Sequence, residues 1–233
     1  MKRELVYTIP GWGFSAGILK QGALADKTCF ELDYFDFSDL SIEGIALELS
    51  KAIKQPSILI AWSMGGLFAI RIASLFPEKV KKLILLASQP RFIADTGYSG
   101  IEYPVMNFFI ESAHQNFFRL KQQFINKVNF PIENDVAPFF LDGYSKQLKN
   151  LLKTLAIADL REDYHYLKTE ILHIIGGRDA VLKQDEQSLR KINSNITVVR
   201  IADAGHCGFL THALSYRCAI DRFISSVNED ARS

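Results

Sequence analysis

The chain lacks an excess of charge of either sign, because 27 Lys and Arg residues balance 26 Asp and Glu residues among 233. A protein that attracts nucleic acid through its overall field carries a net positive charge, so this balance argues against that class. The hydrophobic content of 48% also excludes a disordered chain. The length fits one large or two small globular domains. Any acidic partner must therefore meet a local basic patch.

Cysteines and long apolar runs are also scarce. The cysteines Cys29, Cys207 and Cys218 lack C-x-x-C spacing, so we expect reduced, mostly buried thiols. No pair of His or Cys residues has the spacing of metal ligands, and we expect no metal. The apolar runs 58–62 and 83–87 are far shorter than the roughly 20 residues of a bilayer span. The N-terminus shows no signal-peptide pattern, so we expect a cytoplasmic protein that does not bind membranes.

Buried-strand patterns alternate with helical patterns along most of the chain. Strands are predicted at 5–9, 29–37, 57–62, 82–87, 171–175 and 196–201, and helices at 42–53, 64–76, 184–192 and 209–227. Alternation of this kind implies right-handed crossovers and a mainly parallel sheet covered on both faces. The sequence therefore predicts an α/β architecture.

Residues 97–168 interrupt this alternation. The segment has no β-branched strand and is crowded with phenylalanines, at positions 108, 109, 117, 118, 124, 130, 139 and 140. We predict a helical cap inserted between two parts of an α/β core, which take residues 1–96 and 169–233. The rings either line a pocket over the sheet or form the cap's own core.

Ser63 stands where a buried strand runs into a helix, in the sequence Ala61-Trp62-Ser63-Met64-Gly65. A serine at such a tight strand-to-helix turn exposes its hydroxyl above the sheet, as a nucleophile requires. Ala61 replaces the first glycine of the G-x-S-x-G pattern. The alternative is a serine that only caps the helix.

A serine nucleophile needs an imidazole base and a carboxylate that orients the imidazole. Asp179 and His206 each follow a separate predicted strand, and the order Ser63, Asp179, His206 is that of the α/β hydrolases. Structural alternatives are a helix cap for Asp179 and a loop position for His206. Asp185 and Asp203 are weaker candidates for the acid. The other histidines fall within a predicted strand or on predicted helices and are not expected to take part: His114, His165, His173 and His212.

The first strand ends in Pro10-Gly11-Trp12-Gly13, a turn flexible enough to point a backbone amide at Ser63. We predict an oxyanion hole formed by the amides of Trp12 and Met64. A nucleotide-binding loop is rejected, because neither G-x-G-x-x-G nor the P-loop pattern is present.

Four motifs together carry a resemblance to a known family: Gly11-Trp12-Gly13, residues 62–66, residues 87–92 and residues 155–161. They resemble the pimeloyl-acyl-carrier-protein methyl ester esterases of biotin synthesis, within the α/β-hydrolase superfamily. The resemblance implies an α/β-hydrolase fold with about six strands, because little chain precedes the first one. It implies a serine carboxylesterase that releases methanol without a cofactor. Pro10 departs from the family's usual histidine.

The resemblance also implies contacts in the cap and a partner. The segment that aligns with the family's substrate-contacting stretch is Phe124, Ile125, Asn126, Lys127 and Val128. An acyl carrier protein is acidic, so a docking surface should be basic. The candidates lie on two predicted cap helices: Arg119, Lys121 and Lys127 on one, and Lys146, Lys149 and Lys153 on the next. The alternative is an ordinary solvated helix face. We expect the acyl carrier protein to dock transiently on a monomeric enzyme, and we expect no nucleic-acid partner.

Other functions stay open at this point. One is a general short-chain carboxylesterase, and another is a menaquinone-pathway synthase of the same fold, which would use the triad for proton abstraction. A third is a catalytically silent binding protein of this fold. Retention of Ser63, Asp179 and His206 argues against the silent protein.

Overall fold

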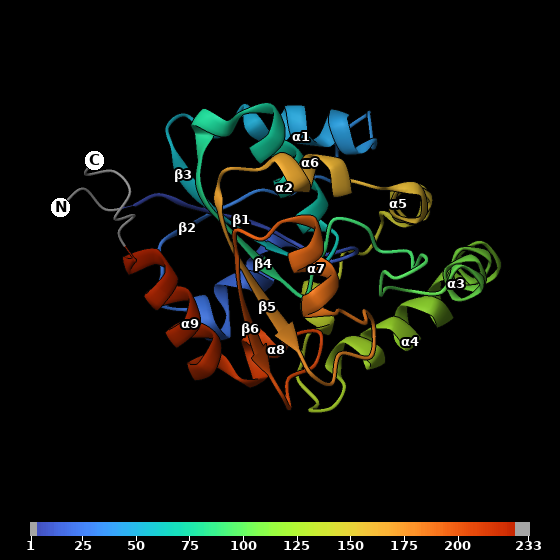
Figure 1. Cartoon of the computed structure of the whole chain (residues 1–233). Coiled ribbons are helices and arrows are strands. Elements are labelled where there is room, and N and C mark those ends of the chain that lie inside the picture. The colour runs from blue at the N-terminus through green and yellow to red at the C-terminus, as the bar shows by residue number, and fades with distance from the viewer. Residues whose placement is uncertain (1–3, 227–233) are drawn as a thin grey trace.

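The computed structural model describes residues 4–226, in which six strands form one parallel sheet with the order β2-β1-β3-β4-β5-β6 (Figure 1). The strands are β1 (Val6–Ile9), β2 (Cys29–Glu31), β3 (Ser57–Trp62), β4 (Val80–Leu86), β5 (Glu170–Gly176) and β6 (Ile196–Ile201). The predicted α/β class and the six-stranded parallel sheet are confirmed. The strand order reverses between β1 and β3, the point at which open α/β sheets place their ligand crevice.

Helices cover both faces of the sheet. On one face lie α1 (Ile42–Ser50), α2 (Gly65–Leu75) and α6 (Arg161–Tyr166), and on the other lie α8 (Gly208–Thr211) and α9 (Ala213–Ser225) (Figure 1). A short helix, α7 (Glu186–Ile192), connects β5 to β6. Because both faces are covered, every residue of β3 is buried, which explains its wholly apolar centre.

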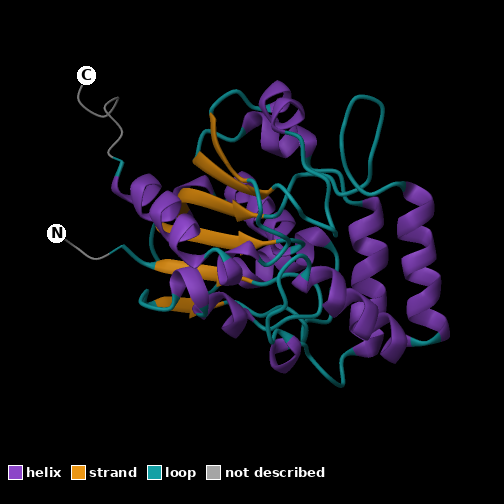
Figure 2. Ribbon diagram, turned by 90° about the horizontal axis from the view of Figure 1, so that it is seen from below, coloured by secondary structure: helices purple, strands orange, loops and turns teal. Residues whose placement is uncertain are grey.

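Three longer helices occupy the connection between β4 and β5: α3 (Tyr103–Gln115), α4 (Phe117–Asn129) and α5 (Ser145–Ile157). They stand beyond the arrowheads of the strands (Figure 2), with α3 packed on both α4 and α5. This inserted layer leaves and rejoins the core at one place, since the Leu160 amide donates to the Pro90 carbonyl at 2.9 Å. Arg91 and Asp159 form an ion pair at the same point.

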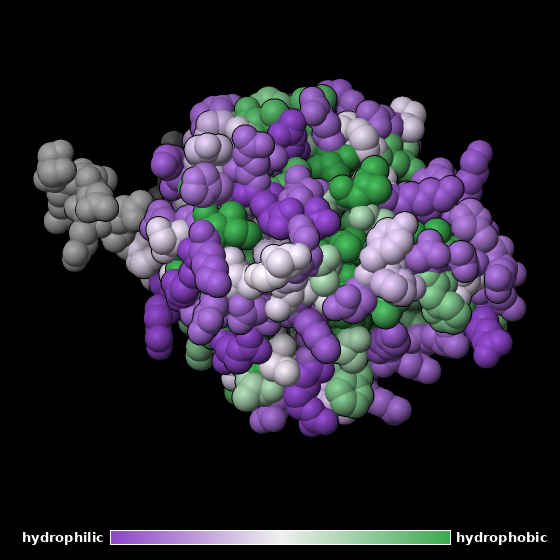
Figure 3. Space-filling model, turned by 45° about the vertical axis from the view of Figure 1, so that its right-hand side comes forward, coloured by the Kyte–Doolittle hydropathy of each residue, from purple (hydrophilic) through white to green (hydrophobic). Residues whose placement is uncertain are grey.

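The surface is mainly polar, as the balanced charge predicts. On the face drawn in Figure 3, hydrophobic side chains gather toward the middle, between the part that holds the sheet and the part that holds the inserted helices. The inserted layer exposes several large apolar side chains: Tyr103, Val105, Phe108 and Phe118.

Two predicted elements differ from the structure by more than a few residues or by a break, and a third differs in burial. The strand expected at 29–37 ends at Glu31, because its neighbour β1 ends at Ile9 and the chain beyond turns away, where Asp33 accepts a hydrogen bond from the Ala16 amide. The strand β6 lies at the edge of the sheet and is only partly buried. The helix expected at 209–227 is divided at His212, and Val227 lies outside the described residues.

Candidate active site

Ser63 lies in a strained turn between β3 and α2. Its φ angle is 51°, in the left-handed region that non-glycine residues rarely adopt. Its amide donates to the carbonyl of Leu86 on the neighbouring strand at 2.9 Å. The turn is also crowded, because a Cβ atom at position 65 would lie 2.4 Å from the Pro10 carbonyl oxygen. Glycine at position 65 therefore permits the close contact between α2 and the end of β1.

Asp179 and His206 reach Ser63 from the loops that follow β5 and β6. His206 Nε2 lies 2.9 Å from Ser63 Oγ, and His206 Nδ1 lies 2.8 Å from Asp179 Oδ2. The other carboxylate oxygen of Asp179 accepts hydrogen bonds from the amides of Val181 and Leu182, at 2.8 and 2.9 Å. The structure therefore brings together the three residues that the sequence singled out.

Close backbone packing holds the two loops side by side. A Cβ atom at position 177 would lie 2.3 Å from the Ala202 carbonyl oxygen, and the Arg178 amide donates to the Ala204 carbonyl at 2.9 Å. Gly205 lets the His206 loop pack against Phe130, the residue that follows α4, because a Cβ atom at position 205 would clash with the Phe130 carbonyl oxygen. The glycines thus permit the close approach of the loops that carry acid and base.

The hydrogen-bond chain can generate a nucleophile. A carboxylate only accepts hydrogen bonds, so Nδ1–H of His206 donates to Asp179 and Nε2 is free to accept the Ser63 hydroxyl proton. The side chains of His206 and Asp179 are 0% and 2% exposed. Low exposure strengthens these charge-assisted interactions.

The amides proposed for the oxyanion hole border Ser63. Met64 follows Ser63 directly, and a Cβ atom at position 11, next to Trp12, would lie 3.0 Å from Ser63 Cβ. Among residues 4–226, neither the Trp12 amide nor the Met64 amide donates a hydrogen bond to another protein group. Both donors remain available. The Trp12 indole is fixed separately, by donating to the Leu148 carbonyl at 2.8 Å.

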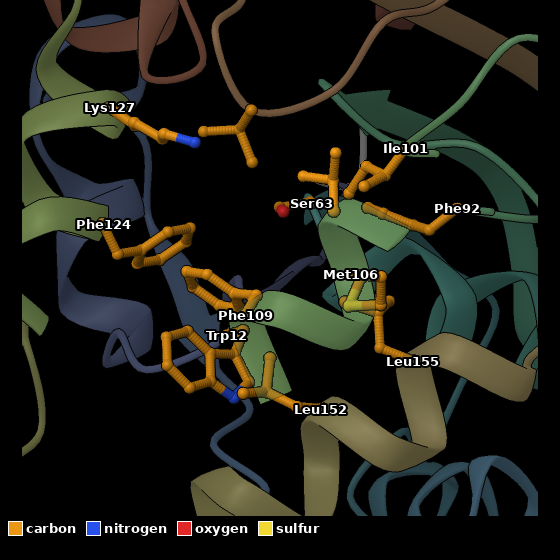
Figure 4. Close-up of a pocket in the computed structure, with 12 residues that line it drawn as sticks. Trp12, Ser63, Phe92, Ile101, Met106, Phe109, Phe124, Lys127, Leu152 and Leu155 are labelled. Atoms are coloured by element: carbon orange, nitrogen blue, oxygen red, sulfur yellow. The ribbon is translucent and has the colours of Figure 1, made fainter. Parts of the chain in front are cut away.

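An apolar cavity lies between Ser63 and the inserted layer (Figure 4). Trp12 packs against Phe124 and Phe109, with ring centroids 5.0 and 5.7 Å apart. The cavity is lined by Trp12, Ser63, Phe92, Ile101, Val105, Met106, Phe109, Phe124, Lys127, Leu152, Leu155 and Val181. Some phenylalanines of the layer thus line the pocket, while Phe108 and Phe118 face solvent.

Only two of the five residues that were aligned with a substrate-contacting stretch reach this cavity, namely Phe124 and Lys127. Ile125 and Val128 are buried in the packing of α4, and Asn126 faces a separate polar hollow. The prediction treated the stretch as contiguous, but a helix turns 100° per residue and presents only one side to the cavity.

The predicted basic residues differ in how free their charges are. Arg119, Lys127, Lys146 and Lys153 are exposed, and Lys149 is half-buried with its ammonium 5.9 Å from the centre of the Phe117 ring. Lys121 is ion-paired with Asp142 at 2.6 Å and its side chain is only 13% exposed. The structure therefore removes Lys121 from the set of free cations.

The weaker candidates have structural partners. Asp185 caps α7 by accepting a hydrogen bond from the Ser188 amide, and Asp203 is exposed. His173 lies within β5, where burial lowers its pKa to about 3 and a hydrogen bond of 2.7 Å joins its Nε2 to the Tyr164 hydroxyl. In residues 4–226 no hydrogen bond joins His114, His165 or His212 to the triad.

Several functional contacts had no signal in the sequence. The indole Nε1 of Trp62 donates to the His206 carbonyl at 2.9 Å, although the residues are far apart in the chain. Phe92, Ile101 and Val181 line the cavity from loops, which carry no hydrophobic periodicity. The thiol of Cys207 is buried next to the base, and burial raises its pKa to about 12.

Two further findings bear on the class of protein. Within residues 4–226, no three His, Cys, Asp or Glu side chains converge as metal ligands would. None of the helices in this part of the chain is long and apolar enough to cross a membrane.

Comparison with known proteins defines the family. A sequence model of the alpha/beta hydrolase family matches residues 3–215, and the chain belongs to this family. Its relatives include proteins named pimeloyl-[acyl-carrier protein] methyl ester esterase. The one from Wigglesworthia glossinidia brevipalpis is 28% identical over 94% of this chain and 93% of its own length. The one from Methylococcus capsulatus is 27% identical over 95% of this chain and 94% of its own length. The resemblance indicated by the sequence motifs is thereby confirmed.

Solved structures agree on the fold. An esterase from Exiguobacterium antarcticum superimposes with a TM-score of 0.84, at 19% identity, over 96% of this chain and 92% of its own.

Proposed function

We propose that the protein is a serine carboxylesterase that hydrolyses the methyl ester of pimeloyl-acyl carrier protein in biotin synthesis. The observation that carries the proposal is the unbroken chain from Ser63 Oγ through His206 to Asp179, with distances of 2.9 and 2.8 Å, at one side of an apolar cavity. The names of the relatives support the choice of substrate.

In this proposal Ser63 Oγ attacks the ester carbonyl carbon while its proton passes to His206 Nε2. The carbonyl oxygen becomes an oxyanion that the amides of Trp12 and Met64 stabilise. The tetrahedral intermediate collapses, and methanol leaves with the proton from His206. Water then gives its proton to His206 and attacks the acyl-enzyme, which releases the acid and restores Ser63. No cofactor takes part in these steps.

The cavity and the surface fit the two parts of this substrate. Apolar walls suit the methylene chain of the acyl group. The exposed cations Arg119, Lys146 and Lys153, together with Lys149, offer a docking surface for an acidic carrier protein. We take the carrier to be a transient partner of a monomeric, cytoplasmic enzyme.

The direct test measures methanol release from the methyl ester of pimeloyl-acyl carrier protein by the wild type and by Ser63→Ala, beside a short-chain p-nitrophenyl ester. Turnover of the carrier substrate that disappears with Ser63 supports both the chemistry and the substrate. Turnover of only the small ester retains the esterase and rejects the biotin substrate. No turnover of either ester rejects the hydrolytic function.

A further inference from the structure

Lys127 is the one charged side chain among the described residues that line the cavity. It projects from α4 one turn after Phe124, and its nitrogen points into the open space opposite Ser63 (Figure 4). No Asp or Glu belongs to the cavity wall as the structure describes it. The cavity therefore combines a nucleophile candidate, apolar walls and a single positive charge.

The Lys127 side chain is exposed, so its ammonium lies where the cavity opens to solvent. Within residues 4–226 it forms no ion pair and no hydrogen bond, whereas Lys121 on the same helix is paired with Asp142. A cation at the opening of an apolar cavity can pair with the negative end of a ligand whose apolar part lies inside. An ion pair of the kind that holds Lys121 therefore does not explain the position of Lys127.

The apolar walls make this charge selective. A carboxylate avoids the apolar interior, where it would lose its hydration, and stays at the opening, where the exposed Lys127 can pair with it. Phe109, Phe124 and Leu152 supply no polar group that could pair with an anion, and Lys127 does. A neutral chain of similar length gains nothing from Lys127, so the residue discriminates between charged and neutral acyl chains.

We propose that the cavity also accepts free monoalkyl esters of dicarboxylic acids, whose carboxylate binds Lys127 while the ester at the other end reaches Ser63. This inference rests on the proposed function, because it uses the same serine chemistry. The anionic half-ester and water give the dicarboxylate dianion, the alcohol and one proton. The activity thus extends from carrier-bound acyl chains to small soluble acids.

The test compares kcat/KM for free monomethyl esters of dicarboxylic acids, from glutarate to azelate, with that for methyl esters of monocarboxylic acids of matched length. The enzymes are the wild type, Lys127→Met, Lys127→Glu and the control Lys54→Met. Lys54 is exposed and precedes β3, whereas Ser63 follows it, so this control lies at the other end of the strand. Thermal melting shows that each variant is folded.

We expect the wild type to prefer the half-ester of best length by about two- to fivefold, because solvent screens an ion pair with an exposed lysine. Lys127→Met should abolish this preference, mainly by raising KM, and leave the neutral esters within about twofold. Lys127→Glu should lower the half-ester activity further, and Lys54→Met should change neither.

Other outcomes overturn the inference without affecting the esterase. These are turnover of neutral esters with no preference for half-esters, a preference that persists in Lys127→Met, and equal losses on both ester classes in that variant. The last result would make Lys127 a structural residue of the cavity wall. Failure of the wild type on every ester, the carrier-bound one included, would instead reject the proposed function itself.

Discussion

The indole of Trp62 donates a hydrogen bond to the carbonyl of His206 at 2.9 Å, and the centres of the two rings are 5.4 Å apart. Trp62 is also the residue immediately before Ser63. One buried side chain at the end of β3 therefore supports the loop that carries the base, while its own backbone leads into the turn that carries the serine. The relative position of Ser63 and His206 depends on this support.

Trp62→Phe should loosen the His206 loop. Phenylalanine retains an aromatic ring but leaves the buried His206 carbonyl without its donor, which costs about 1–3 kcal/mol of unfolding free energy. We expect kcat to fall by about tenfold or more with little change in KM, because small misplacements of reacting groups are costly. Chemical denaturation and ester kinetics measure the two effects. A variant with lower stability and unchanged kcat would show that the hydrogen bond supports only the fold.

Gly65→Ala should destabilise the serine turn. The added Cβ would lie 2.4 Å from the Pro10 carbonyl oxygen, so backbone must move, at a cost of about 1–3 kcal/mol. Gly17→Ala is the matched control, since its Cβ would make only ordinary contacts, the nearest at 3.6 Å. Denaturant midpoints compare the two variants. Equal stability of both would contradict the packing argument.

His173 should make the protein less stable in mild acid. Burial lowers its pKa to about 3, so below the unfolded value near 6.5 the unfolded chain binds a proton that the folded protein does not. Stability is therefore lost as pH falls from about 6.5 toward 3, by about 2 kcal/mol at pH 5 for this group alone. His173→Gln does not titrate, and its amide can still form a hydrogen bond with the Tyr164 hydroxyl.

We expect unfolding free energies at pH 7 and pH 5 to differ less in His173→Gln than in the wild type. His114→Gln, at an exposed position, serves as the control and should retain the wild-type difference. An unchanged pH dependence in His173→Gln would show that other groups govern acid stability.

Charge reversal on α5 should weaken recognition of the carrier protein. Lys146 and Lys153 are exposed on this helix, and neither lines the cavity. The double variant Lys146→Glu and Lys153→Glu should raise KM for the carrier-bound ester by about tenfold and leave a small soluble ester unaffected. Lys54→Glu controls for the change in net charge. Equal effects on the two substrates would remove docking as the explanation.

Much of the fold could be predicted from sequence because buried parallel strands are short apolar runs between turns. The strands β3 and β6 have the predicted bounds, and Ser63, Asp179 and His206 were visible because each follows a strand at the same edge of the sheet. The length of β2 was not predictable in this way, because an edge strand ends where its neighbour ends.

The cavity wall depends on contacts between segments far apart in the chain, which local patterns do not encode. Lys121 and Lys127 look alike in sequence. In the structure, Lys121 pairs with Asp142, whereas Lys127 lines the cavity. The roles of Phe92 and Val181 likewise follow from where loops meet the inserted layer, not from any periodicity.

The hydrogen bond between Leu160 and Pro90 brings the two ends of the inserted layer together, so this layer is a loop closed at its base on the sheet. The entropic cost of such a loop changes only slowly with its length. The segment between these two residues can therefore be lengthened, shortened or exchanged during evolution while β4 and β5 keep their register. Substrate preference can diversify in this layer above a chemical centre that stays the same.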